Sequence, residues 1–186
     1  MTADFRNAPL DDWEVGLLVQ HAAGEEKLEL AVTVLLDTGL RISEFAELCP
    51  ADVYWDRSII VVRGKKGRDG RPKLRQVPLT AQSAGLLRAW FVTHDRVGYH
   101  TSWWYRMIVR LAQQAGILRK LTPHILRHTF AVRALRSGVD IRSVQQALGH
   151  ATLSTTELYL KYVEGTSARA FRDAGWGAPP SPGPVS

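Results

Sequence analysis

The sequence predicts an α+β fold that is mainly α-helical and contains a small three-stranded antiparallel sheet. Three observations support this prediction: apolar residues recur at helical spacing before Pro50, short alternating runs follow between Pro50 and Thr80, and helical spacing returns after Thr80. The chain has 186 residues, of which 45% are hydrophobic, so it can bury one sizeable core. We therefore expect one folded domain.

Three helices are predicted before the sheet. The first spans 10–23 and begins after a proline, and the second spans 25–38, where Gly39 supplies a helix end. A short third helix follows, for which Ser43 is the predicted N-cap. Glutamates stand in its first turns, where the helix dipole favours negative charge.

The three strands are predicted over 52–55, 58–63 and 74–79. A tight turn joins the first two, and a mobile basic loop, GKKGRDGRPK, joins the last two over 64–73. Between positions 57 and 75 the chain has eight basic side chains and one acidic side chain. A solvated hairpin is one interpretation of this loop, and contact with a polyanion is the other.

Helical spacing returns after the sheet, and Gly, Pro or Asp separates the segments. The predicted helices span 80–92, 102–115, 124–137, 141–148 and 154–162. From Gly175 the chain reads GWGAPPSPGPVS, which is too rich in proline and glycine to pack. We therefore expect the folded domain over residues 1–174 and a disordered tail over 175–186.

Charge is distributed unevenly along the chain. Ten acidic and three basic side chains give residues 1–50 a net charge of −7, whereas 21 basic and eight acidic side chains give residues 51–186 a net charge of +13. Such an asymmetry is typical of proteins that bind a polyanion, most often nucleic acid. The alternative is a basic surface that serves only solubility.

Two classes of protein are disfavoured by the sequence. No apolar run approaches the ~18 residues of a membrane span, and the N-terminus lacks the basic start and hydrophobic stretch of an export signal. The single cysteine, Cys49, cannot form an internal disulfide, and its context predicts a small buried side chain rather than a catalytic thiol. We expect a cytoplasmic protein that does not insert into membranes.

Two segments of the chain bring together the residue types of a phosphoryl-transfer site. TPHILRHTFA contains His124 and Arg127, and LGHATLSTTELYL contains His150 and Tyr159. Tyrosine is a poor nucleophile at neutral pH, because its free phenol has a pKa near ~10. It is useful where cations and proton acceptors surround the electrophile. Arg127 and Arg41 together could grip two phosphate oxygens and stabilise a five-coordinate transition state.

Other interpretations exist for each of these residues. Arg41 could be a surface side chain paired with Glu44 or Glu47 at helical spacing. His150 follows a glycine at a predicted helix end, where it could instead be structural. Each feature alone is therefore ambiguous.

A zinc site is a further alternative for the segment HILRH. His124 and His128 have the spacing of two zinc ligands on a helix, but Ile125 stands where H-E-x-x-H peptidases place a glutamate. Phosphoryl transfer assisted by arginines needs no metal. We therefore expect no metal. Of the two tyrosines on the last predicted helix, Tyr159 and Tyr162, one is expected to serve core packing.

Taken in order, these residues resemble the tyrosine recombinase (phage integrase) family, most closely the catalytic domain of Xer-type recombinases. The resemblance covers about residues 10–163. It rests on TGLRISE around the first arginine, a GK-containing β-hairpin that ends in VPL, PHILRHTFA around the second arginine, and LGHATLSTTELY. In the last motif the tyrosine stands nine residues after the histidine, as in the family.

The resemblance implies the tyrosine recombinase catalytic-domain fold and a role for each candidate residue. Tyr159 would attack a scissile DNA phosphate, leaving a 3′-phosphotyrosine and a free 5′-hydroxyl. Arg41 and Arg127 would clamp the phosphate. His124 would assist proton transfer from the tyrosine, and His150 would hydrogen-bond the transition state.

The resemblance also implies a general acid on the hairpin. Lys65 follows Gly64 as the family's hairpin lysine follows its glycine, but Lys66 competes because this hairpin is longer than usual. Glu44 resembles the acidic residue that supports the first arginine. No cofactor is implied.

The implied function is a site-specific recombinase or integrase that cleaves and rejoins double-stranded DNA in the nucleoid. Its partners would be further copies of the chain in a homotetramer on DNA, with another recombinase or accessory proteins. The family's N-terminal core-binding domain is expected to be absent, and the segment 168–174 would dock on a neighbouring subunit or on its own domain. Two alternatives stay open: a catalytically silent DNA-binding regulator and a type IB topoisomerase-like enzyme.

Overall fold

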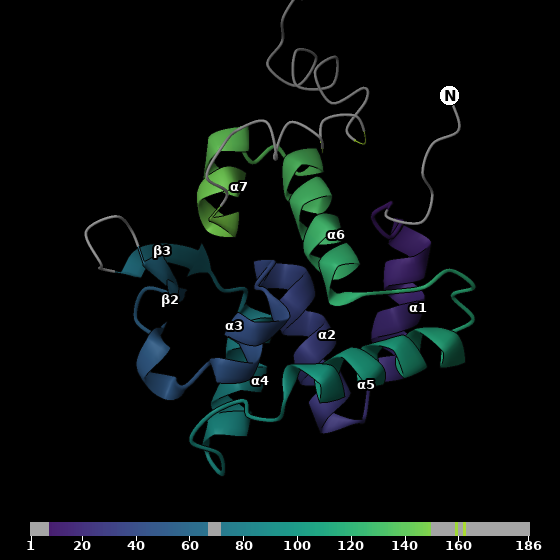
Figure 1. Cartoon of the computed structure of the whole chain (residues 1–186), viewed down its shortest axis with the longest axis horizontal. Helices are drawn as coiled ribbons and strands as arrows, with labels where there is room; N and C mark the ends of the chain where they lie inside the picture. Colours follow the sequence, from purple (N-terminus) through teal and green to yellow (C-terminus); the bar gives the residue numbers. More distant parts are fainter. Residues whose placement is uncertain (1–7, 67–71, 150–158, 160–161, 163–186) are drawn as a thin grey trace, which may run out of the picture.

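Helix α2 lies in the middle of the molecule, and α1, α4, α5 and α6 pack around it (Figure 1). The computed structural model describes residues 8–66, 72–149, 159 and 162. The helices are α1 (Asp12–Ala22), α2 (Glu26–Thr38), α3 (Ile42–Glu47), a 3₁₀ turn η2 (Pro50–Asp52), α4 (Ala81–Phe91), α5 (Thr101–Gln114), α6 (Pro123–Arg136) and α7 (Ile141–Leu148). The strands are β1 (Val53–Tyr54), β2 (Ile59–Lys66) and β3 (Pro72–Pro78).

The strands form one antiparallel sheet in the order β1-β2-β3, which confirms the predicted α+β fold class. Ile60, in the middle strand, faces Val53 on one side and Val77 on the other, and all three side chains are buried. β2 and β3 are longer than predicted, so they take up part of the segment 64–73 that the sequence assigns to a loop. An irregularity in register between Arg63 and Lys66 lets the pairing continue into the charged part of the hairpin.

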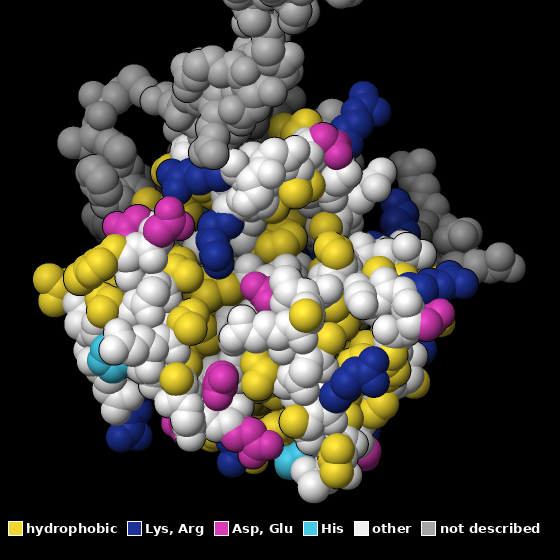
Figure 2. All heavy atoms as spheres, turned by 180° about the vertical axis from the view of Figure 1, so that it is seen from behind, with side chains coloured by type: hydrophobic (Ala, Val, Ile, Leu, Met, Phe, Trp, Pro, Cys, Tyr) yellow, Lys and Arg dark blue, Asp and Glu magenta, His cyan; other side chains and the backbone are white. Residues whose placement is uncertain are grey.

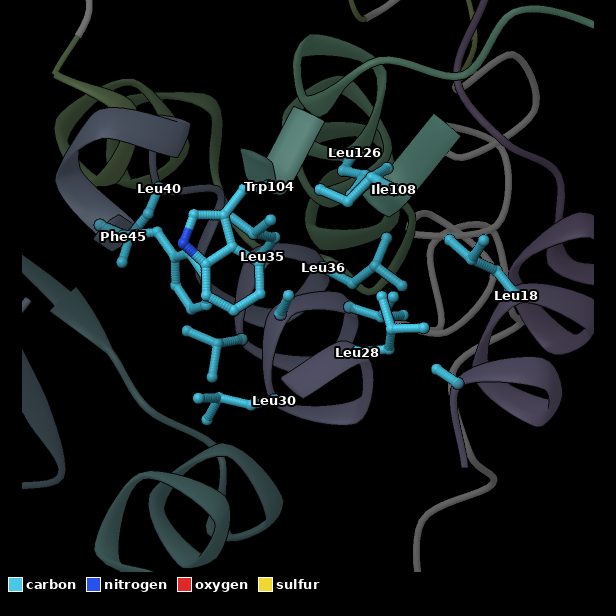
Figure 3. Packing of buried hydrophobic residues seen from close by; sticks show 14 of the residues in the cluster. Leu18, Leu28, Leu30, Leu35, Leu36, Leu40, Phe45, Trp104, Ile108 and Leu126 are labelled. Atoms are coloured by element: carbon cyan, nitrogen blue, oxygen red, sulfur yellow. The ribbon is translucent and has the colours of Figure 1, made fainter. Parts of the chain in front are cut away.

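The main core lies between α2 and the helices around it (Figure 3). At its centre the rings of Phe45 and Trp104 meet edge to face, with centroids 5.1 Å apart. A second, smaller cluster joins α6 and α7. It contains Ala131, Val132, Leu135, Val144, Leu148 and Tyr159. The candidate nucleophile is therefore packed against the two helices that precede it in the chain.

The first described residues are fixed to the body of the domain by hydrogen bonds. Arg119 donates to the carbonyl oxygens of Ala8 (2.5 Å) and Pro9 (2.7 Å) and also pairs with Glu14 on α1. The backbone N–H of Leu10 donates to the hydroxyl of Thr129 on α6, at 2.8 Å. These bonds tie the start of the described chain to α6.

One predicted helix cap is wrong. Ser43 lies inside α3, and Arg41 occupies the N-cap position. The Glu44 carboxylate accepts a hydrogen bond of 2.8 Å from the backbone N–H of Arg41, so it satisfies an unpaired donor at the helix start. This reach-back bond outweighs the local preference of serine for the cap.

Two other helices begin one residue before their predicted starts, and α6 has Thr122 as its cap and Pro123 at its first position. The predicted helix 154–162 and the tail 175–186 fall outside the described residues except at 159 and 162.

Helices in the described part of the chain are too short or too polar to cross a membrane. On the face opposite to that of Figure 1, basic, acidic and apolar side chains are intermingled (Figure 2).

Replacing Gly39 by alanine is expected to destabilise the domain. Gly39 ends α2 with φ +61°, and a β-carbon there would lie 2.3 Å from Cδ1 of Phe130. Backbone strain and overpacking together should lower the free energy of unfolding by about 1–3 kcal/mol. Urea denaturation followed by circular dichroism measures the change.

The matched control is Gly16→Ala, in the exposed face of α1, where nothing lies within 4 Å of the added carbon. That substitution should raise the free energy of unfolding by about 0.5–1 kcal/mol, because alanine is the better helix former. Equal effects of the two substitutions would contradict this account of Gly39.

Candidate active site

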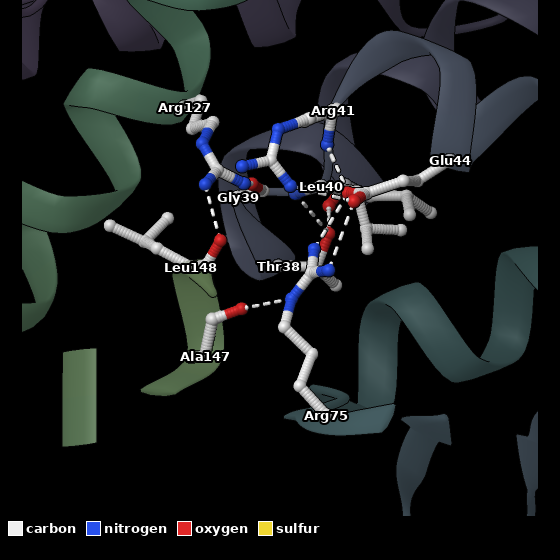
Figure 4. A network of polar contacts seen from close by, with 10 residues as sticks. Thr38, Gly39, Leu40, Arg41, Glu44, Arg75, Arg127, Ala147 and Leu148 are labelled. Atoms are coloured by element: carbon white, nitrogen blue, oxygen red, sulfur yellow. Dashed lines mark hydrogen bonds and ion pairs between the residues drawn. The ribbon is translucent and has the colours of Figure 1, made fainter. Parts of the chain in front are cut away.

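Arginine side chains from three separate segments converge where α2 ends and α3 begins (Figure 4). Arg41 comes from the start of α3, Arg75 from β3 and Arg127 from the middle of α6. Glu44 lies among them, and backbone carbonyl groups at the ends of α2 and α7 complete the network.

Arg127 is held inside the protein by the C-terminal ends of two helices. Its side chain points inward from α6, and only 4% of the residue is exposed. Nη1 donates to the carbonyl oxygen of Gly39 at 2.7 Å, and Nη2 donates to that of Leu148. Helix C-termini carry partial negative charge and unpaired carbonyl groups, which suit a buried cation.

Burial, followed by the positive charge of neighbouring Arg41, lowers the pKa of Arg127 to about 10. The guanidinium is still charged at neutral pH, but it is less stable as a cation than an arginine in water. An anion bound beside it would relieve this cost. The site therefore favours a negatively charged ligand.

Arg41 is the more accessible arginine. Its Nη1 donates to Oε1 of Glu44 at 2.9 Å, which confirms the expected pairing of these residues. The side chain is nevertheless 43% exposed, and its charge acts on Arg127. Arg41 is thus both a partner of Glu44 and a neighbour of Arg127. Pairing with a glutamate and a place in a phosphate-binding site are therefore compatible for this residue.

Glu44 accepts hydrogen bonds from two arginines at once. Arg75 donates from Nη1 and Nη2 to the two carboxylate oxygens, at 2.9 and 2.6 Å, while Arg41 contributes the bonds described above. Burial alone would raise the pKa of Glu44, but the hydrogen bonds from Arg75 and Arg41 outweigh it and hold that pKa below its usual value. The carboxylate is therefore charged at neutral pH.

Arg75 is a residue of this network that sequence reasoning missed. Its Nε also donates to the carbonyl oxygen of Ala147 at 2.8 Å, so one side chain joins β3 to α3 and α7. The alternation of side chains along a strand could have indicated its role. Arg75 shares a face of the strand with Val77 and Leu79, which are buried. An arginine on the buried face of a strand needs an acidic or carbonyl partner.

Tyr159 lies against α6, within electrostatic reach of Arg127. Only 9% of the residue is exposed, and its ring lies 4.5 Å from that of His128, centroid to centroid. Burial raises the pKa of its phenol, and the positive charge of Arg127 acts in the opposite direction. The phenol is therefore protonated at neutral pH. Tyr162 also meets His128, edge to face at 5.5 Å, and its carbonyl oxygen accepts from Arg136.

The other candidates are placed in part or lie outside the described residues. His124 lies in the first turn of α6, one turn before Arg127, and its side chain is exposed. Lys65 and Lys66 lie at the end of β2, where the structure describes the backbone alone. His150 lies outside the described residues, directly after Gly149, which ends α7 in the left-handed conformation.

This arrangement matches a known family over most of the chain. The family described as "Phage integrase family" matches residues 10–164. The chain belongs to the phage integrase family. It resembles the tyrosine recombinase XerA of Thermococcus kodakarensis, with 38% identity over 148 residues, covering 71% of this chain and 50% of that protein.

Solved structures agree with this membership. The crystal structure of a XerA recombinase superposes with a TM-score of 0.78 and 33% identity, covering 94% of this chain and 66% of that chain. The catalytic domain of bacteriophage HP1 integrase shares the fold, with a TM-score of 0.68 and 24% identity over 94% of this chain and 99% of that chain. The fold is that of a tyrosine recombinase catalytic domain, and the chain spans about half the length of the curated relative that it matches.

Replacing Glu44 by glutamine is expected to destabilise the domain in a pH-dependent way. Two arginines would lose their charged partner, so the free energy of unfolding at neutral pH should fall by about 2 kcal/mol. The folded state lowers the pKa of Glu44, so the stabilisation is present above the unfolded value of ~4.3 and is lost as the pH falls through the lowered pKa.

Urea denaturation of wild type and Glu44→Gln, at values from about pH 3 to neutral pH, measures this effect. The difference in unfolding free energy should be largest at neutral pH and should shrink below about pH 4. Glu47→Gln, an exposed change on the same helix, is the control and should show little difference at any pH. A difference for Glu44→Gln that does not change with pH would rule out the charged form as the stabilising one.

Proposed function

We propose that this domain cleaves and rejoins DNA strands as the catalytic domain of a site-specific tyrosine recombinase, through a 3′-phosphotyrosine intermediate. The observation that carries the proposal is the position of Tyr159, within electrostatic reach of Arg127, which in turn lies beside Arg41. A nucleophile and two cations are thereby available to one phosphate. Membership of the phage integrase family supports the same reaction.

In the proposed reaction, the Tyr159 oxygen attacks the scissile phosphorus and displaces the 5′ oxygen of the next nucleotide. Arg41 and Arg127 bind the non-bridging oxygens and stabilise the charge of the five-coordinate transition state. Arg127 has both Nη atoms on carbonyl oxygens, so its orientation is set before the substrate arrives. Such preorganisation reduces the rearrangement needed when charge develops on the phosphate.

Two proton transfers accompany the proposed cleavage. The phenol of Tyr159 must lose its proton, which burial makes harder and the charge of Arg127 makes easier. We assign assistance in this step to His124, and hydrogen bonding to the transition state to His150. The leaving 5′ oxygen must gain a proton, for which Lys65 is the proposed general acid and Lys66 its competitor.

The phosphotyrosine conserves the energy of the broken phosphodiester, so a 5′-hydroxyl from a partner duplex can reverse the reaction without a cofactor. Double-stranded DNA is the proposed substrate. Its negatively charged backbone is attracted by the net charge of +13 on residues 51–186. Exchange between duplexes requires several subunits, and we propose a homotetramer on DNA in the nucleoid, with another recombinase or accessory proteins as further partners.

Replacing Tyr159 by phenylalanine is expected to abolish covalent attachment to DNA. The wild-type protein, incubated with a nicked suicide substrate that traps the cleaved strand, should give a covalent adduct visible by denaturing gel electrophoresis. Tyr159→Phe removes the nucleophilic oxygen and should give none. Tyr162→Phe is the matched control and should still form the adduct, because it leaves the hydroxyl of Tyr159 in place. Tyr162 is a suitable control since it packs against the same cluster of apolar side chains.

Persistence of the adduct in Tyr159→Phe would sink the assignment of the nucleophile. DNA binding by the wild type without any adduct would favour a silent DNA-binding regulator. Relaxation of supercoiled plasmid without sequence preference would favour a type IB topoisomerase-like enzyme.

A further inference from the structure

We infer that Arg75 is a positioning residue for the proposed cleavage, which sets the geometry of the two phosphate-binding arginines without touching the phosphate itself. The inference rests on the proposed function. It concerns how Arg41 and Arg127 are held rather than which residues perform the chemistry.

The side chain of Arg75 joins three elements of the fold. Arg75 extends from β3 and binds both carboxylate oxygens of Glu44, which belongs to α3, while its Nε binds the carbonyl oxygen of Ala147 at the end of α7 (Figure 4). These residues are 31 and 72 positions away from Arg75 in the sequence. All three hydrogen bonds come from one planar group, so the relative placement of α3, β3 and α7 is fixed together.

Each residue to which Arg75 donates hydrogen bonds is directly connected to a candidate arginine. Glu44, which Arg75 holds by a fork of two bonds, also binds the backbone N–H and Nη1 of Arg41. Ala147 precedes Leu148, whose carbonyl oxygen accepts from Arg127. Arg75 therefore acts on Arg41 through the carboxylate of Glu44. It acts on Arg127 through the backbone at the end of α7.

Arg75 packs closely against the turn that ends α7. A β-carbon on Gly149, which has φ +67°, would lie 2.9 Å from Cδ of Arg75. The side chain of Arg75 is only 10% exposed, and its guanidinium is directed at Glu44 and Ala147. Arg75 is thus part of the packed interior beside the site. The side chain of Arg41, by contrast, is 43% exposed and so is accessible to a ligand.

Arg75 also affects the electrostatics of the site. Arg75 is one of the positive charges that lower the pKa of Arg127, and it takes a share of the Glu44 carboxylate that would otherwise belong to Arg41 alone. Without Arg75, Glu44 would neutralise Arg41 more completely. The network would then stabilise the charge that develops in the transition state less strongly, in addition to being less well ordered.

The test is single-turnover cleavage of three suicide substrates by wild type, Arg75→Gln and Arg75→Lys. In each reaction the Tyr159 oxygen forms a bond to phosphorus, the bond from phosphorus to the 5′ atom breaks, and the phenol proton is lost. The first substrate has an ordinary phosphodiester. The second has an uncharged methylphosphonate at the scissile position, and the third has a 5′-bridging sulfur, whose thiolate leaves without needing a proton.

On the ordinary substrate, Arg75→Gln should cleave on the order of 10- to 100-fold more slowly than wild type, because small misplacements of catalytic groups are that costly. DNA affinity, measured by fluorescence anisotropy, should change less than threefold or so, since Arg75 does not contact the phosphate. Arg75→Lys keeps the charge but loses the fork, so it should also be slow.

The modified substrates identify which part of the reaction Arg75 serves. The penalty should shrink on the methylphosphonate, because an uncharged phosphoryl group depends less on the arginine pair. It should persist on the bridging sulfur. A penalty that disappears on the sulfur substrate instead would overturn the inference, since Arg75 would then serve the protonation of the leaving group. A penalty equal on all three substrates would also overturn it, since the role would be structural.

Arg96→Gln is the control, because it removes the same charge from an exposed loop and should cleave like wild type. Urea denaturation checks folding, and Arg75→Lys carries the test if Arg75→Gln does not fold. A wild type that forms no adduct contradicts the proposed function itself. An active wild type with equally active, folded Arg75 variants contradicts only this inference.

Discussion

The burial of Arg127 is the constraint on which the rest of the site depends. A guanidinium placed inside a protein must have its charge balanced and its N–H groups satisfied, or it destabilises the fold. Here the acceptors are the carbonyl groups of Gly39 and Leu148, at the ends of α2 and α7. Both helices must therefore stop where they do and point at the same place. The need to satisfy the buried guanidinium of Arg127 therefore determines both the arrangement of these helices and the geometry of the site.

The charge balance around Arg127 explains why the site is suited to an anion. Three arginines, at positions 41, 75 and 127, share the single carboxylate of Glu44 within this described network. Carbonyl dipoles make up part of the difference, but the network keeps an excess of positive charge. Such a network is electrostatically suited to an anion, and the proposed DNA phosphate would supply negative charge that it lacks.

Local sequence signals predicted the elements well, and they predicted the long-range network poorly. The strands and the helices follow from periodicity. Family motifs draw attention to Arg41, Arg127 and Tyr159, and the structure places Arg127 within electrostatic reach of the other two. The local preference of serine predicts a cap at Ser43, whereas the carboxylate of Glu44 decides the helix start. Arg75 was missed because its partners on α3 and α7 become neighbours only after the sheet packs against the helices.

The roles of His124, His150 and Lys65 stay predictions. His124 is exposed in the first turn of α6, whereas His150 and the side chain of Lys65 lie outside the part of the chain that the structure describes. The buried half of the site is specified by packing and hydrogen bonds. The assignment of the other three residues takes its support from the family motif alone.

The use of backbone carbonyl groups to hold Arg127 and Arg75 has a consequence for how such a domain can diverge. A carbonyl oxygen is present whatever the residue, so Ala147 and Leu148 can be exchanged for other residues of similar size without loss of either acceptor. Whether the acceptor exists therefore depends on the path of the main chain and not on the side chain at either position. The supporting structure of the site is encoded in where the helices end rather than in the chemistry of single side chains.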